Sequence, residues 1–171
     1  MVSNREAPAG RQQYPLVSII IPYFNARETI RLTVESLLQS GYPGLEIICV
    51  DDRSDDGTQE TISDFPVAHV CMVRRSGAAV ARNTGASRAS GEILFFIDAD
   101  VAAMPDTIFK MAETFTTDPS VDACFGEYTA LPITGNFATT YKNLVHHYTH
   151  QSSRPEAHTF WCGCGAIRAE V

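Results

Sequence analysis

The sequence contains no long apolar run and no excess of positive charge. Its apolar segments are far shorter than the roughly 18 residues of a membrane-spanning helix. Residues 1–14 lack the apolar centre of a secretion signal, so we interpret them as a flexible leader. Lysine and arginine number 13 against 20 aspartate and glutamate residues, a net charge of −7. This balance argues against broad electrostatic binding to nucleic acid.

Two common phosphate-binding motifs are also absent. A dinucleotide-binding fold places G-x-G-x-x-G after its first strand, where this chain has Pro22-Tyr23-Phe24-Asn25. No G-x-x-x-x-G-K segment occurs either. Both motifs need glycine so that backbone amides can approach phosphate. The sequence therefore argues against a dinucleotide fold and against a P-loop.

The cysteines show no recognisable framework. They are odd in number and scattered, and the tight pair Cys162 and Cys164 lacks the two-residue spacer and the second pair of a zinc site. We interpret them as reduced, partly buried thiols of a cytosolic protein. The five are Cys49, Cys71, Cys124, Cys162 and Cys164.

Short β-branched runs alternate with helical periodicity along the 171 residues, a length sufficient for one domain with its own core. This alternation predicts an α/β fold, with a mostly parallel central sheet and helices on both faces. The predicted strands are 17–21, 45–50, 67–73, 93–97, 121–129 and 160–167. The predicted helices are 27–40, 58–64, 78–89, 105–115 and 137–149.

Acidic residues follow the predicted strands. The apolar run 93–97 reads as a buried strand and leads directly into Asp98 and Asp100. Asp51 and Asp52 follow an earlier strand in the same way. Because parallel strands end at one edge, where open α/β sheets bind ligands, we expect these carboxylates to converge on one cleft. Their mutual repulsion then calls for a divalent cation, which prefers oxygen ligands and also binds phosphate.

Four segments, in this order and spacing, resemble the successive blocks of family 2 glycosyltransferases. The resemblance covers about residues 17–105, and it implies the GT-A fold, whose nucleotide-binding half is Rossmann-like. It also implies transfer of a sugar from a nucleoside diphosphate sugar, usually with inversion at the anomeric carbon. The segments are Val17-Ser-Ile-Ile-Ile-Pro-Tyr-Phe-Asn25, Ile48-Cys-Val-Asp-Asp-Arg-Ser-Asp-Asp-Gly-Thr58, Gly77-Ala-Ala-Val-Ala-Arg-Asn-Thr-Gly85 and Gly91-Glu-Ile-Leu-Phe-Phe-Ile-Asp-Ala-Asp100.

The resemblance also implies roles on the donor side. Asp52 matches the acid that accepts a hydrogen bond from the base, commonly the uracil N–H, and Asp51 either contributes there or holds the turn. Arg82 matches a contact to base or phosphate, with a surface helix position as the alternative. The segment that lines the nucleotide pocket corresponds to Pro22, Tyr23, Asn25 and Glu28.

The same resemblance implies a metal site of the D-x-D type. Asp98 would lie near the ribose and the metal, and Asp100 would ligate Mg²⁺ or Mn²⁺ beside the diphosphate. Gly163 and Gly165 fall in a region that helps to form the acceptor-side floor. One departure concerns Arg75, because the family pattern often has asparagine there.

The expected organisation is a leader (1–14), a nucleotide-sugar-binding core (15–130) and the start of an acceptor-side region (131–171). The family's general base sits in a Glu-Asp or similar pair after the glycine region, and Glu170 is not in that motif. We therefore expect an N-terminal portion of a longer enzyme, which binds donor and metal but turns over sugar poorly alone. A non-catalytic nucleotide-sugar-binding module is the alternative.

A UDP-sugar is the favoured donor and a GDP-sugar the second choice. The implied acceptor is a glycan or a lipid-linked sugar, in polysaccharide or glycoconjugate biosynthesis. We expect a cytoplasmic location, at the cytoplasmic face of a membrane if further segments supply membrane helices.

Overall fold

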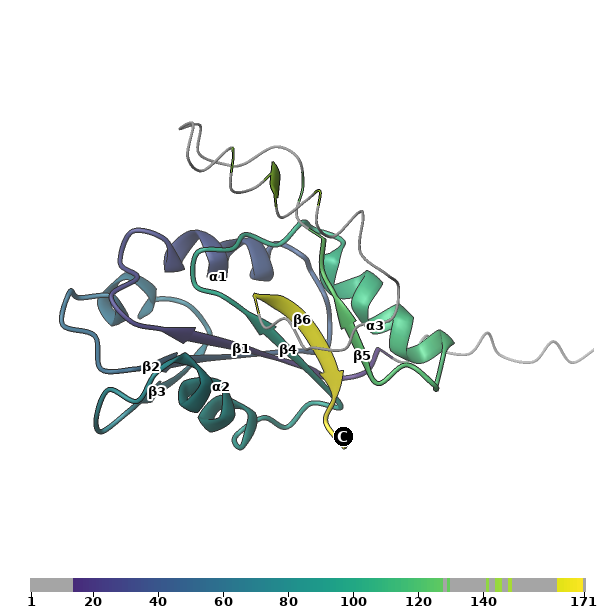
Figure 1. Cartoon of the computed structure of the whole chain (residues 1–171), viewed down its shortest axis with the longest axis horizontal. Helices are drawn as coiled ribbons and strands as arrows, with labels where there is room; N and C mark the ends of the chain where they lie inside the picture. Colours follow the sequence, from purple (N-terminus) through teal and green to yellow (C-terminus); the bar gives the residue numbers. More distant parts are fainter. Residues whose placement is uncertain are drawn as a thin grey trace, which may run out of the picture.

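A computed structural model describes residues 14–127, 129, 141, 144, 145, 148 and 163–170. Its centre is a six-stranded sheet in the order β3-β2-β1-β4-β6-β5 (Figure 1). In chain order the elements are β1 (Val17–Tyr23), α1 (Ile30–Leu38), β2 (Leu45–Asp51), the 3₁₀ helix η1 (Gln59–Ile62), β3 (Ala68–Cys71), α2 (Ala78–Ala86), β4 (Ile93–Ile97), α3 (Thr107–Thr117), β5 (Ala123–Phe125) and β6 (Cys164–Arg168).

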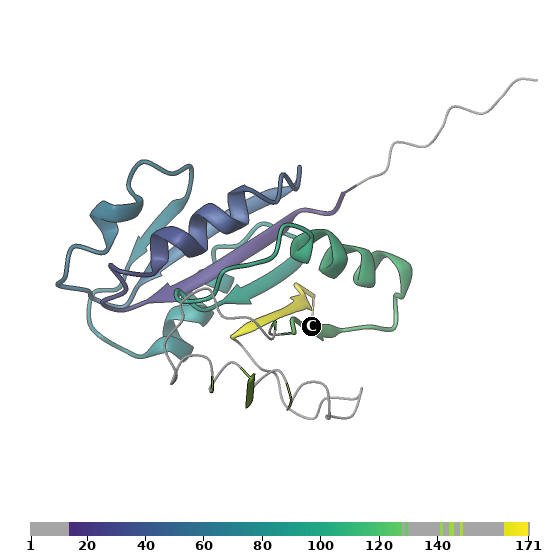
Figure 2. The same cartoon turned by 90° about the horizontal axis from the view of Figure 1, so that it is seen from above.

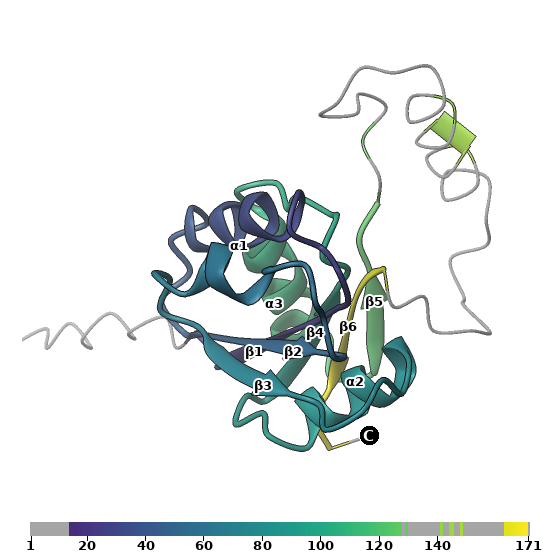
Figure 3. The same cartoon turned by 90° about the vertical axis from the view of Figure 1, so that its left-hand side faces the viewer.

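The sheet is parallel in its first four strands. β1 pairs in parallel with both β2 and β4, and β2 pairs in parallel with β3. β6 is antiparallel to its two neighbours, β4 and β5, and Figure 3 shows it between them. This confirms the expected mostly parallel sheet. The order β3-β2-β1-β4 is that of a Rossmann-like half, in which the chain changes direction across the sheet between β1 and β4.

Helices cover both faces of the sheet, as the sequence predicted. Every residue of β1 and β4 is buried, because these central strands are apolar on both sides of the pleat. One face packs on α1 and α3, and Figure 2 looks onto that side. The other face packs on α2 (Figure 3). Burial of these apolar side chains is the main stabilising term of such a domain.

A glycine allows α2 to lie close to the sheet. A Cβ atom added at Gly85 would lie 2.5 Å from Cγ2 of Ile20 and 3.0 Å from Cγ2 of Val50. Both distances are at or below the closest approach that a real side chain tolerates, so only glycine fits without a shift of β1 or β2. The close packing fixes α2 on the sheet, and with it the residues at its N-terminal end.

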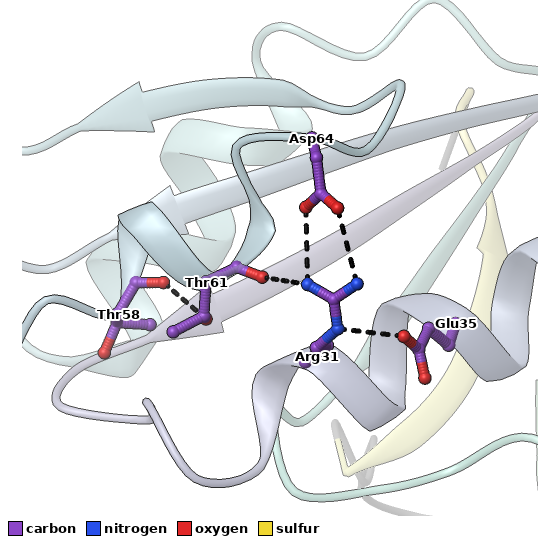
Figure 4. A network of polar contacts seen from close by, with 5 residues as sticks. All are labelled: Arg31, Glu35, Thr58, Thr61 and Asp64. Atoms are coloured by element: carbon purple, nitrogen blue, oxygen red, sulfur yellow. Dashed lines mark hydrogen bonds and ion pairs between the residues drawn. The ribbon is translucent and has the colours of Figure 1, made fainter.

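An exposed polar network connects α1 to η1 (Figure 4). The guanidinium of Arg31 donates to Glu35 at 2.9 Å, to the carbonyl of Thr61 at 3.0 Å and to Asp64 at 3.3 Å. Thr61 in turn donates to the carbonyl of Thr58 at 2.7 Å. Exposed ion pairs contribute little to stability individually. The network joins α1 to η1, which comes after the loop that follows β2.

Several element boundaries differ from the sequence prediction. The predicted helix 58–64 is only the single turn of η1, and the predicted strand 121–129 shortens to β5. Of the predicted helix 137–149, only residues 141, 144, 145 and 148 are described, each helical, and the others lie outside the described residues. The four described cysteines are free, and Cys162 lies outside the described part. Among the described residues, no helix has both the length and the apolar character needed to cross a membrane.

Candidate functional site

The carboxyl ends of β1, β2 and β4 meet at one edge of the sheet. Tyr23, the last residue of β1, is in register with Asp51, the last residue of β2. The amide of Asp52 donates to the carbonyl of Tyr23 at 2.8 Å, and Asp98 directly follows β4. Asp52 and the Asp98–Asp100 segment are therefore on the same rim, on either side of the switch point between β1 and β4. This is the position at which open α/β sheets bind ligands.

A small pocket of about 80 Å³ opens at this edge. It lies between the end of β1 and the start of α2, so that strand-end and helix residues share its wall. The guanidinium of Arg75 stacks over the ring of Phe24, with its central carbon 3.8 Å from the ring centroid. The lining residues are Pro22, Tyr23, Phe24, Asp52, Ala78 and Ala81.

Phe24 is a pocket residue that the sequence interpretation did not single out. Phe24 is partly buried and directly follows a buried strand, at the edge where open α/β sheets bind ligands. An aromatic ring at such a strand end could have been noticed in the sequence, since it offers a flat apolar surface to a planar ligand.

Asp52 holds the loop that leads into α2. Its side chain is almost fully buried, with 3% exposure. One carboxylate oxygen accepts the amide of Ser76 at 2.7 Å, and the other accepts the amide of Gly77 at 2.8 Å. Gly77 has φ +90°, a backbone conformation that favours glycine. Each carboxylate oxygen keeps a second lone pair, so Asp52 can still accept a hydrogen bond from a ligand.

Asp51 holds the turn after β2. Its carboxylate accepts the amide of Ser54 at 2.8 Å. Of the two roles that the sequence left open for Asp51, this contact corresponds to the turn. Asp51 is not one of the residues that line the pocket.

Asn25 ties the loop after β1 to the loop after β2. Its side-chain amide donates to Asp55 at 2.9 Å and its side-chain oxygen accepts the amide of Asp55 at 3.0 Å. Its own backbone amide donates to Ser54 Oγ at 3.0 Å, and its φ is +50°. Asn25 thus shapes the rim instead of lining the pocket. Glu28 is exposed and is also absent from the pocket lining.

The hydroxyl of Tyr23 is buried and has no hydrogen-bond acceptor among the described residues. Burial, followed by the charge of Asp51, raises the pKa of Tyr23 far above its ordinary value. Tyr23 therefore stays protonated, and it contributes packing to the rim without supplying a base.

An ion pair joins α2 to the end of β4. Arg82 Nη2 lies 2.5 Å from Asp98 Oδ1, and the two side chains are 18% and 39% exposed. The backbone amide of Asp98 donates to the carbonyl of Gly163 at 3.1 Å, which places Gly163 at the same rim. Asp100 is exposed, whereas Gly165 is buried within β6, opposite Phe96 of β4.

Asp98 and Asp100 have the donor chemistry for a divalent cation, although they do not form a complete protein cage. Among the described residues there is no group of three or more histidine, cysteine, aspartate or glutamate side chains arranged to hold a metal ion. Two carboxylates with open positions suit Mg²⁺ or Mn²⁺ shared with a phosphate ligand, because such ions usually complete their shell with phosphate oxygens and water. The residues therefore fit a metal that arrives with a substrate.

A model of the family described as glycosyl transferase family 2 matches residues 18–171. The chain belongs to glycosyl transferase family 2. The family resemblance and the GT-A-like fold expected from the sequence are thereby confirmed.

Among its relatives is TuaG of Bacillus subtilis (strain 168), named for teichuronic acid biosynthesis, which is 35% identical over 137 residues, or 77% of this chain and 53% of TuaG. Another is WfgD of Escherichia coli, a UDP-Glc:α-D-GlcNAc-diphosphoundecaprenol β-1,3-glucosyltransferase, 30% identical over 140 residues, or 76% of this chain and 55% of WfgD. This family 2 chain thus spans about half the length of these two relatives.

A solved structure supports the same assignment. The mannosyltransferase PcManGT from Pyrobaculum calidifontis, in complex with GDP-Man and Mn²⁺, matches with a TM-score of 0.71 at 25% identity. The match covers 93% of this family 2 chain and 46% of PcManGT.

Proposed function

We propose that this chain forms the donor-binding part of a metal-dependent glycosyltransferase that uses a nucleoside diphosphate sugar. The observation that carries the proposal is the common rim at the β1/β4 switch point. On it, a pocket bordered by Asp52 lies on one side and the Asp98–Asp100 carboxylates lie on the other. A nucleotide needs both parts, one for its base and one for its diphosphate.

The base occupies the pocket in this proposal. Pro22 and Phe24 offer apolar surface to its ring, and Asp52 accepts a hydrogen bond from a ring N–H. Uracil and guanine both carry such a group. UDP-sugar is our preferred donor, in line with the donor in the name of WfgD, and GDP-sugar is the second, in line with the ligand of PcManGT.

The diphosphate lies across the rim toward Asp98 and Asp100. These two carboxylates hold Mg²⁺ or Mn²⁺, and the cation supplies stabilisation of the negative charge that grows on the departing nucleoside diphosphate. Arg82 contacts a phosphate oxygen, a role that suits the geometry and permanent charge of guanidinium. No described residue is assigned the role of general base.

The acceptor approaches from the side of Gly163, whose carbonyl accepts a hydrogen bond from the backbone amide of Asp98. We expect a sugar hydroxyl of a glycan or a lipid-linked glycan as acceptor and inversion at the anomeric carbon, in polysaccharide or glycoconjugate biosynthesis. A lipid-linked acceptor would bring the whole protein to the cytoplasmic face of a membrane.

Binding measurements test this proposal directly. Thermal unfolding is followed with UDP, GDP or ADP, each with and without Mn²⁺. At a ligand concentration of about 100 times Kd, binding to the folded state alone adds about 2.7 kcal/mol of stability. We expect a metal-dependent rise in Tm with UDP or GDP, and loss of the metal-dependent part in Asp100→Asn. Asp122→Asn is the matched control, because it removes an exposed carboxylate that lies between α3 and β5 in the sequence.

The outcomes separate the candidates. No rise in Tm with any nucleotide would refute the donor site. A rise with UDP or GDP, but no sugar transfer or donor hydrolysis by the full-length protein, would favour the non-catalytic binding module.

A further inference from the structure

The Arg82–Asp98 ion pair engages one of the two carboxylates of the proposed metal site. Arg82 comes from α2 and Asp98 follows β4, and only 18% of the arginine side chain is exposed. Arg82 Nε is buried and has no acceptor among the described residues. A buried donor without a partner is unfavourable, so this guanidinium is only partly satisfied by Asp98.

Asp98 and Asp100 differ in how available their carboxylates are to a ligand. Asp100 is exposed, and among the described residues no hydrogen bond or ion pair engages its carboxylate. Asp98 is neutralised by Arg82. A cation that binds both carboxylates must therefore displace the guanidinium from Asp98, or share Asp98 with it.

Within the proposed function, on which this inference rests, we propose that Arg82 changes partner when the ligand binds. In the free protein it pairs with Asp98, and in the bound protein it pairs with the diphosphate while the cation takes Asp98. Arg82 and Asp98 then each have an opposite charge beside them in both states. The phosphate oxygens also give the buried Nε of Arg82 an acceptor.

The exchange makes metal and nucleotide binding mutually dependent. Metal alone would remove Asp98 from Arg82 and leave the partly buried guanidinium without a counter-ion. Nucleotide alone would draw Arg82 away and leave the carboxylate of Asp98 facing the anionic diphosphate. Each ligand therefore lowers the cost of binding the other, and such coupling is reciprocal.

The first test measures Mn²⁺ binding without nucleotide, by the electron paramagnetic resonance signal of free Mn²⁺. In Arg82→Met, which keeps an apolar stem, we expect Mn²⁺ affinity to rise about tenfold, because a competing charged hydrogen bond is gone. UDP affinity in the presence of Mn²⁺ should fall in the same variant. Arg88→Met removes an exposed arginine close in sequence and should change neither. A fall in Mn²⁺ affinity, or an equal rise in Arg88→Met, would overturn the exchange.

The second test needs no metal and remains informative if Arg82→Met does not fold. UDP is titrated by calorimetry in the presence of a chelator. Asp98→Asn frees Arg82 and should bind UDP more tightly than the wild-type protein. Asp100→Asn removes the same charge from the same rim but breaks no ion pair, so it should gain less. Equal gains in the two variants would mean that charge alone matters, and the exchange would be refuted.

Failure of the inference is distinguishable from failure of the proposed function. A wild-type protein that binds neither UDP nor GDP with Mn²⁺ would refute the donor site, and the exchange with it. A wild-type protein that binds them, with variants that follow the refuting patterns above, would leave the donor site intact and remove only the exchange.

Discussion

Replacement of Asp52 should loosen the loop before α2 as well as weaken nucleotide binding. In Asp52→Ala the amides of Ser76 and Gly77 lose the two carboxylate oxygens that accept them at 2.7 and 2.8 Å. Asp52→Asn keeps one side-chain oxygen, so it can satisfy one of the two amides. The structure thus predicts a graded loss of stability, from aspartate through asparagine to alanine.

The size of the loss follows from these contacts. A hydrogen bond to a charged group contributes about 1.5–3 kcal/mol. The lower end applies to each bond, because Ser76 is only half-buried and Gly77 is exposed, so water replaces part of the loss. Asp52→Ala also removes the cost of burying the carboxylate charge, which offsets a further part of the loss in stability. We expect about 2 kcal/mol for Asp52→Ala, or a fall in Tm of about 4–8 °C in a domain of this size.

Urea unfolding of the wild-type protein and both variants measures this series. Asp122→Ala is the matched control, because Asp122 is exposed and its carboxylate has no hydrogen bond or ion pair among the described residues. If Asp52→Ala stays within about 0.5 kcal/mol of Asp122→Ala, the range of ordinary surface substitutions, the carboxylate does not hold the loop and the reasoning fails.

Three further predictions concern packing, acid stability and thiol reactivity. Gly85→Ala gains about 1 kcal/mol of helix propensity but forces Cβ to 2.5 Å from Ile20 Cγ2, so urea unfolding should show a net loss of about 1–2 kcal/mol, and a gain would contradict the close packing of α2. Burial raises the pKa of Glu46, but hydrogen bonds from two serines outweigh it and the net pKa lies below 4.5. Since Glu46 binds its proton more readily in the unfolded chain than in the folded one, its ionised carboxylate stabilises the fold above about pH 4.5. This contribution to the free energy of unfolding is lost as the pH falls below that value. Glu46→Gln should therefore flatten the acid dependence of urea unfolding below pH 4.5, and an unchanged slope would count against the bonds. Burial raises the pKa of Cys164 to about 12, whereas Cys71 is exposed, so mass spectrometry after alkylation at about pH 8 should find Cys71 labelled well before Cys164, and equal rates would refute the burial.

The sequence was sufficient for the layout of the domain because its signals are local. Short apolar runs and helical spacing depend on near neighbours, and they identified strands such as 93–97 and helices such as 105–115 within a few residues. The position of the acidic residues also followed, since parallel strands share one carboxyl edge. Element ends were less predictable, as η1 shows, because packing decides where a helix stops.

The partners of the rim residues were decided only by the tertiary structure. Asp52 faces amides 24 and 25 residues away, Asn25 pairs with Asp55, and Arg82 pairs with Asp98. These contacts depend on how strands, loops and α2 pack against one another, which no local pattern records. Sequence alone therefore determined which chemical groups reach the edge of the sheet. Packing determined which of them hold the loops, and it left Asp100 exposed.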